Sequence, residues 1–133
     1  MTAKEAKAYL MQYRESLDRA REIAEHLDEL KAEAVRLRDH EGQRVELDAA
    51  VARYVDACAD SVHELDRLAA LRAEIIGAVD AVPDRRLRQL LREVYISGKR
   101  IVRIAADRDR SYEHICRLHG DALCAVAEIL RNM

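Results

Sequence analysis

The sequence has no phenylalanine and no tryptophan, and five tyrosines are its only large aromatic side chains. It also has one proline and four glycines in 133 residues. Turn residues this scarce exclude a β-sandwich or a β-barrel, because each short strand of those folds must end in a turn. A chain rich in alanine, leucine, glutamate and arginine instead predicts long helices. We therefore expect an all-α fold.

Long apolar runs are also missing. No stretch approaches the roughly 18 apolar residues that indicate a membrane span, and the charged N-terminal segment does not resemble a secretory signal. The three cysteines are an odd number, which does not fit a disulfide framework. We expect a protein of the bacterial cytoplasm with no membrane partner.

Sequence signatures of catalysis and of metal binding are absent as well. There is no glycine-rich phosphate loop and no nucleophile elbow. Cys116, His119 and Cys124 are close in sequence, but their spacing does not bring them to one face of a helix. We therefore predict no enzymatic activity, no metal site and no cofactor.

The two parts of the chain differ in charge. Residues 1–83 carry 12 basic and 18 acidic side chains, whereas residues 84–133 carry 11 basic and 7 acidic ones. The basic segment is therefore the candidate for contact with nucleic acid.

The first 82 residues predict a long antiparallel helical hairpin that serves assembly or acts as a scaffold. Apolar residues recur at alternating spacings of three and four from Thr2 to Arg38 and again from Arg44 to Val82, with Gly42 in the turn between them. One hairpin leaves apolar surface uncovered, so we expect a homo-oligomer formed through these helices. The stripe expected to be buried in the second helix is Val51, Val55, Cys58, Val62, Leu65, Ala69, Ile76 and Val79.

Pro83 marks a boundary, because proline favours the start of a helix and disfavours helical geometry in the residue before it. Residues 83–133 predict shorter helices over 84–96, 99–108 and 112–132. Ser111 is a suitable N-cap for the last helix. Two short elements, a tight turn and a capped helix are the layout of a helix-turn-helix DNA-binding unit.

A helical wheel of the last helix indicates which side chains face DNA. Glu113 and Arg117 lie opposite the apolar side, where arginine suits a guanine edge and glutamate suits the cytosine amino group. In the alternative interpretation, these two residues are an i,i+4 pair that only solvates the helix. The predicted base-reading residues are Tyr112, Glu113, His114 and Arg117. The predicted DNA phosphate contacts are Lys99, Arg100, Arg103, Arg110, Ser111 and Gly120.

The stretch from Leu91 to Leu123 resembles the C-terminal segment of phage transcriptional regulators of the RinA/ArpU type, which is similar to region 4 of bacterial sigma factors. The matching residues are Tyr95, Ile96, Gly98, Lys99, Ile104, Ala105, Ser111, His114, Arg117, Leu118, His119, Gly120, Ala122 and Leu123. The resemblance implies a sequence-specific regulator that acts on double-stranded DNA at a promoter together with host RNA polymerase. The chain departs from the family at Arg108, Asp109 and Arg110, and loss of an apolar residue at position 108 is expected to weaken packing between the short helices.

Two other functions remain open. One is a small packaging-type DNA-recognition subunit, and the other is a protein-only adaptor that binds RNA polymerase. A complete sigma factor is not expected, because promoter opening needs a domain that captures unstacked bases on aromatic side chains. The first 83 residues contain only three tyrosines.

Overall fold

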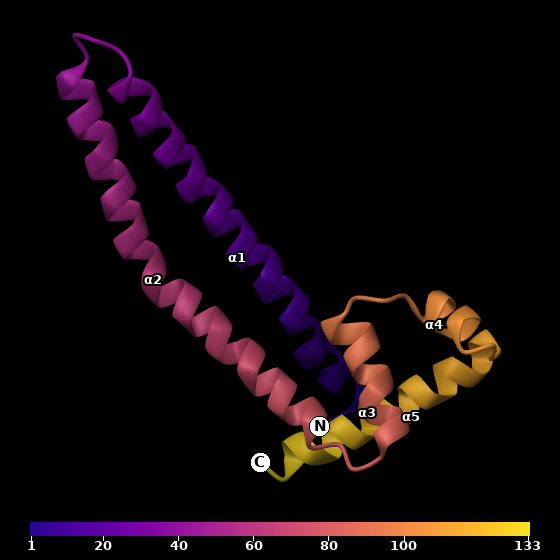
Figure 1. The fold of residues 1–133 in the computed structure, drawn as a ribbon. Helices are drawn as coiled ribbons and strands as arrows, with labels where there is room; N and C mark the ends of the chain where they lie inside the picture. Colours follow the sequence, from indigo (N-terminus) through magenta and orange to yellow (C-terminus); the bar gives the residue numbers. More distant parts are fainter. The chain divides into compact units, whose positions relative to one another are not determined.

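The structure, a computed structural model, describes residues 1–133, and every regular element in it is a helix (Figure 1). The predicted all-α fold, with two long helices before a set of shorter ones, is confirmed. The elements are α1 (Ala3–Arg38), α2 (Arg44–Asp80), α3 (Arg85–Leu91), the π-helical turn η1 (Arg92–Ile96), α4 (Ile101–Asp107) and α5 (Tyr112–Arg131).

Some helix boundaries differ from the predicted ones. The expected helix over 84–96 is α3 followed by the π-helical turn, in which the Ser97 N–H donates to the Arg92 carbonyl at 2.9 Å. The expected helix over 99–108 begins only at Ile101. Lys99 and Arg100 therefore precede α4 instead of forming its first turn.

The chain forms two compact units, residues 17–69 and residues 1–16 together with 70–133. This division differs from the predicted boundary at Pro83. The physical reason is that a break in a helix does not mark the limit of side-chain packing. Leu10 of α1 and Val79 of α2 belong to the same buried core as Val126 of α5.

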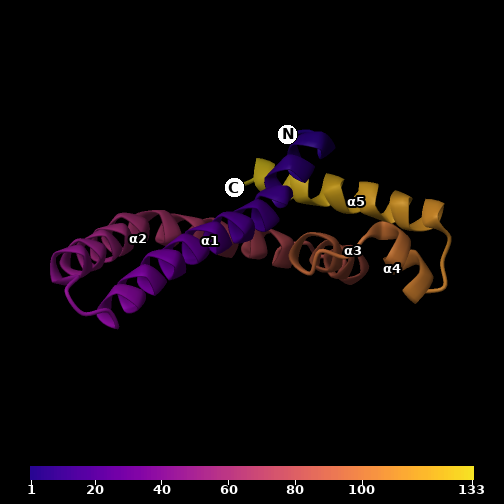
Figure 2. The same cartoon turned by 90° about the horizontal axis from the view of Figure 1, so that it is seen from above.

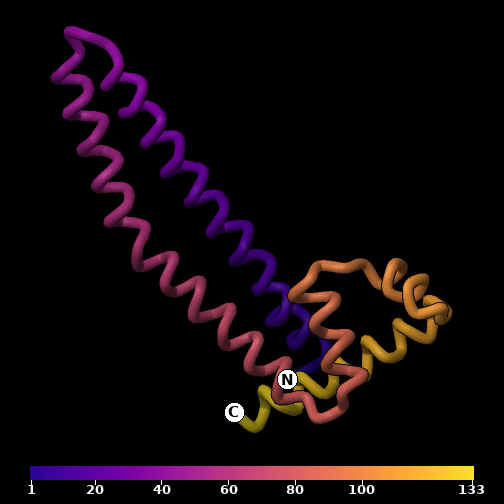
Figure 3. Tube along the Cα trace, in the orientation of Figure 1, coloured from indigo at the N-terminus to yellow at the C-terminus, as the bar shows by residue number.

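The unit of residues 17–69 is an antiparallel hairpin, and α1 and α2 run side by side within it in both Figure 1 and Figure 2. Arg19 pairs with Glu64 at 2.7 Å, and Arg53 pairs with Glu33 at 3.4 Å. The Cα trace shows the connection at one end of the hairpin (Figure 3). The α2 side chains that are at least partly shielded here include Leu47, Ala50, Tyr54, Ala57, Ser61, Glu64 and Leu68.

The prediction that this part of the α2 stripe is buried is wrong for its three valines. Val51, Val55 and Val62 are 44%, 56% and 51% exposed. Each of these valines directly follows a residue of the shielded row in the sequence. The shielded row has the same alternating spacings of three and four residues. The hairpin therefore has an apolar stripe that α1 does not cover.

The unit of residues 1–16 and 70–133 has a larger core. The N-terminal part of α1 and the last turns of α2 pack with α3, η1 and α5, and the Tyr9 hydroxyl donates to Glu74 at 3.0 Å. Asp84 caps α3 by accepting from the Arg86 N–H at 2.9 Å, and this hydrogen bond lowers the pKa of its carboxyl. The fully buried side chains of this core include Leu10, Ile75, Val79, Val82, Leu91 and Val126.

Candidate nucleic-acid interface

A small separate core holds α4 and α5 against α3. It contains Leu90 of α3, Ile104 and Ala105 of α4, and Ile115 of α5, all at most 5% exposed. Apolar burial of this kind fixes one side of α5 against the protein. The opposite side of its first turns is left for solvent or a partner.

The turn between α4 and α5 contains Arg108, Asp109 and Arg110, of which Arg108 was expected to be unfavourable for packing of the short helices. Asp109 adopts a φ of +52°, in the left-handed region that aspartate tolerates better than most residues. The Arg110 N–H donates to the Ala105 carbonyl at 2.9 Å and closes the turn. An aspartate therefore supplies the conformation for which glycine or asparagine is usual.

Arg108 has a partner that the sequence did not indicate. Its guanidinium contacts the Glu93 carboxylate of η1 at 2.6 Å, and the two side chains are only 28% and 19% exposed. The expected weakening of the unit at this position is therefore opposed by an ion pair between the end of α4 and η1. The partners are 15 positions apart in the sequence, and no periodic pattern between them would reveal the pair.

Ser111 caps α5 as predicted. Its backbone is extended and its hydroxyl accepts from the His114 backbone N–H at 3.1 Å. The cap satisfies one of the free N–H groups at the helix start and fixes where the first turn begins. The Ser111 hydroxyl oxygen thus already accepts a hydrogen bond within the chain, although the residue itself is exposed.

Three of the four predicted base-reading residues lie on the open side of α5. Tyr112 is 52% exposed, and Glu113 and Arg117 are also exposed. The ion pairs within the chain include none between Glu113 and Arg117, so the solvating i,i+4 pair is not formed. His114 differs from these three because it is partly buried and lines a neighbouring hollow.

That hollow has a volume of about 490 Å³ and a basic lining. Its charged walls come from α3 and from the turn before α5. Arg86 and Arg108 each have an acidic partner, whereas Arg110 has none. Sequence reasoning did not select Arg86, because only the fold brings α3 to the start of α5. The lining residues are Arg86, Arg108, Arg110, His114, Ile115 and Leu118.

Four of the predicted phosphate contacts lie on α4 or beside it, whereas Ser111 caps α5 and Gly120 lies within α5. Arg100 and Arg103 are exposed, while Lys99 is partly buried. Arg103 has only a loose contact with Asp107, at 3.8 Å. Gly120 has open space where a side chain would stand, so packing within the chain does not require glycine there.

Besides Glu113, a second exposed residue on the same side of α5 is acidic. Asp121 follows Arg117 by one helical turn and was not weighed in the sequence prediction. Its charge opposes approach of a phosphate backbone beyond Arg117. The surface suited to DNA therefore ends within the first turns of α5.

Comparison with protein-family models, with curated proteins and with solved structures finds no match to this chain. No group of three histidine, cysteine or carboxylate side chains is placed to hold a metal ion. None of the helices is both long and apolar enough to cross a membrane.

Proposed function

We propose that the chain is a sequence-specific regulator of transcription that reads double-stranded DNA with α5. The observation that carries this proposal is the exposure of Arg117 and Glu113 together with their lack of ion-pair partners. Both are exposed on the first turns of a capped helix, and neither has an ion-pair partner in the chain. The buried core behind α5 holds these side chains on a rigid element, as base readout requires. The resemblance to phage regulators of the RinA/ArpU type supports the same assignment.

The basic residues around α5 suit the phosphate backbone. Arg100 and Arg103 on α4 and Arg110 before α5 are exposed, and Arg110 also lines the basic hollow. Such contacts set the position of a protein on DNA, while side chains in the groove supply the sequence preference. Exposed arginines grouped beside one capped helix also favour duplex DNA over a protein-only partner.

The hairpin supports a second part of the proposal, which is assembly with another copy of the chain. One side of the hairpin carries the ion pairs of Arg19 and Arg53, and another carries the exposed valines. An apolar groove of about 270 Å³ lies between the helices on the valine side. It is lined by Lys31, Ala34, Val35, Arg38, Leu47 and Val51.

The size of this face fits a second hairpin. The α2 segment from Leu47 to Ala69 is about 34 Å long, and two helices side by side are roughly 20 Å wide. A face of those dimensions covers roughly 700 Å², close to the about 800 Å² that each partner contributes to a standard interface.

The charges at the edges of the face select the arrangement of the two copies. Lys31 and Arg38 line the groove on α1, whereas Asp48 and Asp66 stand one turn from the exposed valines of α2. A parallel two-fold pairing places α2 of each copy over α1 of the other. It therefore brings Asp48 toward Lys31 and Arg38 of the second copy. Two copies also present two recognition helices, as a two-half-site operator requires.

Sedimentation equilibrium tests the assembly. We expect the wild-type chain at micromolar concentration to sediment at twice its mass of 15.2 kDa. Val55→Glu should shift it to the monomer mass, because a carboxylate would be buried in the interface. Val45→Glu is the matched control, since Val45 is 79% exposed and lies outside both the groove and the row of Val51, Val55 and Val62. A wild-type monomer, or equal effects of both variants, would contradict the pairing.

The salt dependence of binding to a duplex of arbitrary sequence tests the phosphate contacts. We expect Arg110→Gln to reduce the slope of log affinity against log salt by about one. Arg21→Gln, which changes an exposed arginine of the hairpin, should leave the slope unchanged. Retention of RNA polymerase without any DNA binding would instead favour the adaptor function.

A further inference from the structure

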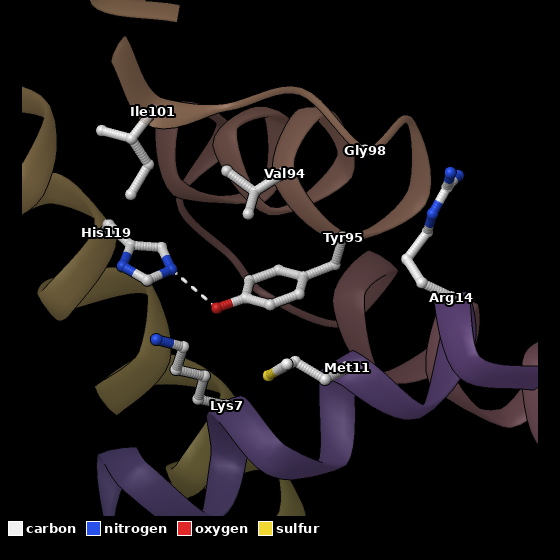
Figure 4. A pocket seen from close by; sticks show the side chains of 8 residues that line it. All are labelled: Lys7, Met11, Arg14, Val94, Tyr95, Gly98, Ile101 and His119. Carbon is white, nitrogen blue, oxygen red and sulfur yellow. Dashed lines mark hydrogen bonds between the residues drawn. The ribbon is translucent and has the colours of Figure 1, made fainter.

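A second cavity shares no lining residue with the basic hollow (Figure 4). Its volume is about 380 Å³, at the lower end of the range for small-molecule sites. Its walls come from the N-terminal part of α1, from η1 and the loop after it, and from α5. The lining residues are Lys7, Met11, Arg14, Val94, Tyr95, Gly98, Ile101 and His119.

The polar part of the cavity is a pair formed by buried Tyr95 and partly buried His119. A hydrogen bond of 2.7 Å joins the Tyr95 hydroxyl to Nε2 of His119, and the two rings stack with centroids 5.7 Å apart. Burial raises the pKa of Tyr95 to about 12 and lowers the pKa of His119. Both side chains are therefore uncharged at neutral pH, and the pair presents a flat surface with little charge.

The two charged side chains that line the cavity, Lys7 and Arg14, are both positive. Lys7 extends toward Tyr95 and His119 in Figure 4, and it is close enough for its charge to contribute to the lowered pKa of His119. None of the ion pairs within the chain includes Lys7, and no acidic residue lines the cavity. An ammonium beside an apolar cavity without a carboxylate favours an anionic ligand.

Arg14 has a different task from Lys7. It donates to the Ile96 carbonyl at 3.2 Å, and its guanidinium packs on Gly98. Gly98 has a φ of +75°, and a Cβ there would stand 3.0 Å from Cζ of Arg14. Glycine thus permits both the turn and the close approach of the guanidinium, which fixes the wall of the cavity.

We propose that this cavity binds a small organic carboxylate with an aromatic or branched apolar body. Lys7 pairs with the carboxylate, while Met11, Val94 and the Tyr95–His119 pair contact the apolar part. Placement of η1 in the wall agrees with the frequent occurrence of π-helical turns at functional sites. Ile101 is the first residue of α4, so a bound carboxylate touches the start of the helix-turn-helix. The cavity is therefore placed to act as an effector site.

Titration with naphthalene-2-carboxylate and with its neutral isostere naphthalene-2-carboxamide tests the proposal, with no DNA present. NMR signals of the His119 ring report on the cavity directly. We expect the carboxylate to bind with a dissociation constant below about 1 mM and about tenfold more tightly than the amide. Lys7→Gln should remove that preference, and it changes only an exposed side chain that is not needed for the core.

Lys31→Gln is the matched control, because Lys31 lines the other apolar groove, in the hairpin. The preference for the carboxylate should survive this substitution. Equal binding of carboxylate and amide would overturn the proposal, as would loss of the preference in Lys31→Gln alone. So would no response of His119 at saturating probe. None of these outcomes bears on DNA binding, which is tested separately.

Discussion

The ion pair between Arg108 and Glu93 offers a quantitative test of how α4 is held against η1. It replaces an apolar contact expected at the end of α4, and it joins α4 to η1 through a 2.6 Å contact. If the pair stabilises the unit, the effects of removing the two partners will not add. A double-mutant cycle measures that difference directly.

The expected coupling energy follows from the burial of the two side chains. Charge centres about 4 Å apart attract by about 4 kcal/mol at an effective dielectric constant of about 20. Desolvation offsets much of this attraction, because both side chains are more than two-thirds buried. Exposed pairs contribute about 0.2–1 kcal/mol. We therefore expect a coupling energy of about 1–2 kcal/mol between Arg108 and Glu93.

The cycle uses Arg108→Met, Glu93→Gln and the double variant in urea unfolding at one fixed protein concentration, since the proposed dimer would make stability depend on concentration. The double variant should lose less stability than the two single losses together. Arg103 and Asp107, exposed and 3.8 Å apart, are the control and should show coupling below about 0.5 kcal/mol. Additivity within about 0.5 kcal/mol at Arg108 and Glu93 would refute the role assigned to the pair.

Three further predictions concern stability. His119 has a lowered pKa in the folded protein, so its contribution is present above about pH 6.5 and is lost as pH falls toward the folded pKa. The free energy of unfolding of His119→Gln should therefore fall less than that of the wild type as the pH drops from about 7.5 to 5.5. Parallel pH profiles of the two chains would contradict this. Ser111→Ala should lose about 1 kcal/mol in urea unfolding through the missing cap, and no loss would contradict the capping role. Arg72→Met should gain about 1 kcal/mol, because Nη1 of Arg72 is buried without a hydrogen-bond partner, whereas exposed Arg67→Met should change nothing. A stability loss in Arg72→Met would show that this nitrogen is satisfied.

The sequence was informative wherever a local pattern decides the structure. The position of Ser111 before a periodic apolar segment predicted the N-cap of α5, and Gly42 predicted the turn of the hairpin. The wheel of α5 correctly placed Glu113 and Arg117 on the exposed side. In each case the determining interactions lie within about one helical turn, so neighbouring residues contain the information.

The prediction was wrong where two patterns compete. Two rows with the same spacing run along α2, one residue apart, and the row that faces α1 includes the polar residues Ser61 and Glu64. The more apolar row of Val51, Val55 and Val62, which was predicted to be buried, is the exposed one. That uncovered row is also the basis of the proposed dimer.

Contacts between distant residues were not predictable at all. Tyr95 and His119 are 24 residues apart, and Arg86 reaches the basic hollow only because α3 packs on α5. Pro83 correctly indicated an interruption between helices, yet the compact units divide elsewhere. Tertiary packing decides all three features, and no local signal in the chain encodes them.

The most direct test of the central claim is selection of bound duplexes from a random DNA pool at about 0.15 M salt, where non-specific phosphate binding is weakened. The wild-type chain, Arg117→Ala and the control Arg131→Ala would be compared, since Arg131 lies in the last turn of α5. We predict an enriched motif that Arg131→Ala retains and that Arg117→Ala loses or relaxes at one base pair. Absence of any enriched motif with folded protein, or identical motifs for all three chains, would contradict DNA reading by α5.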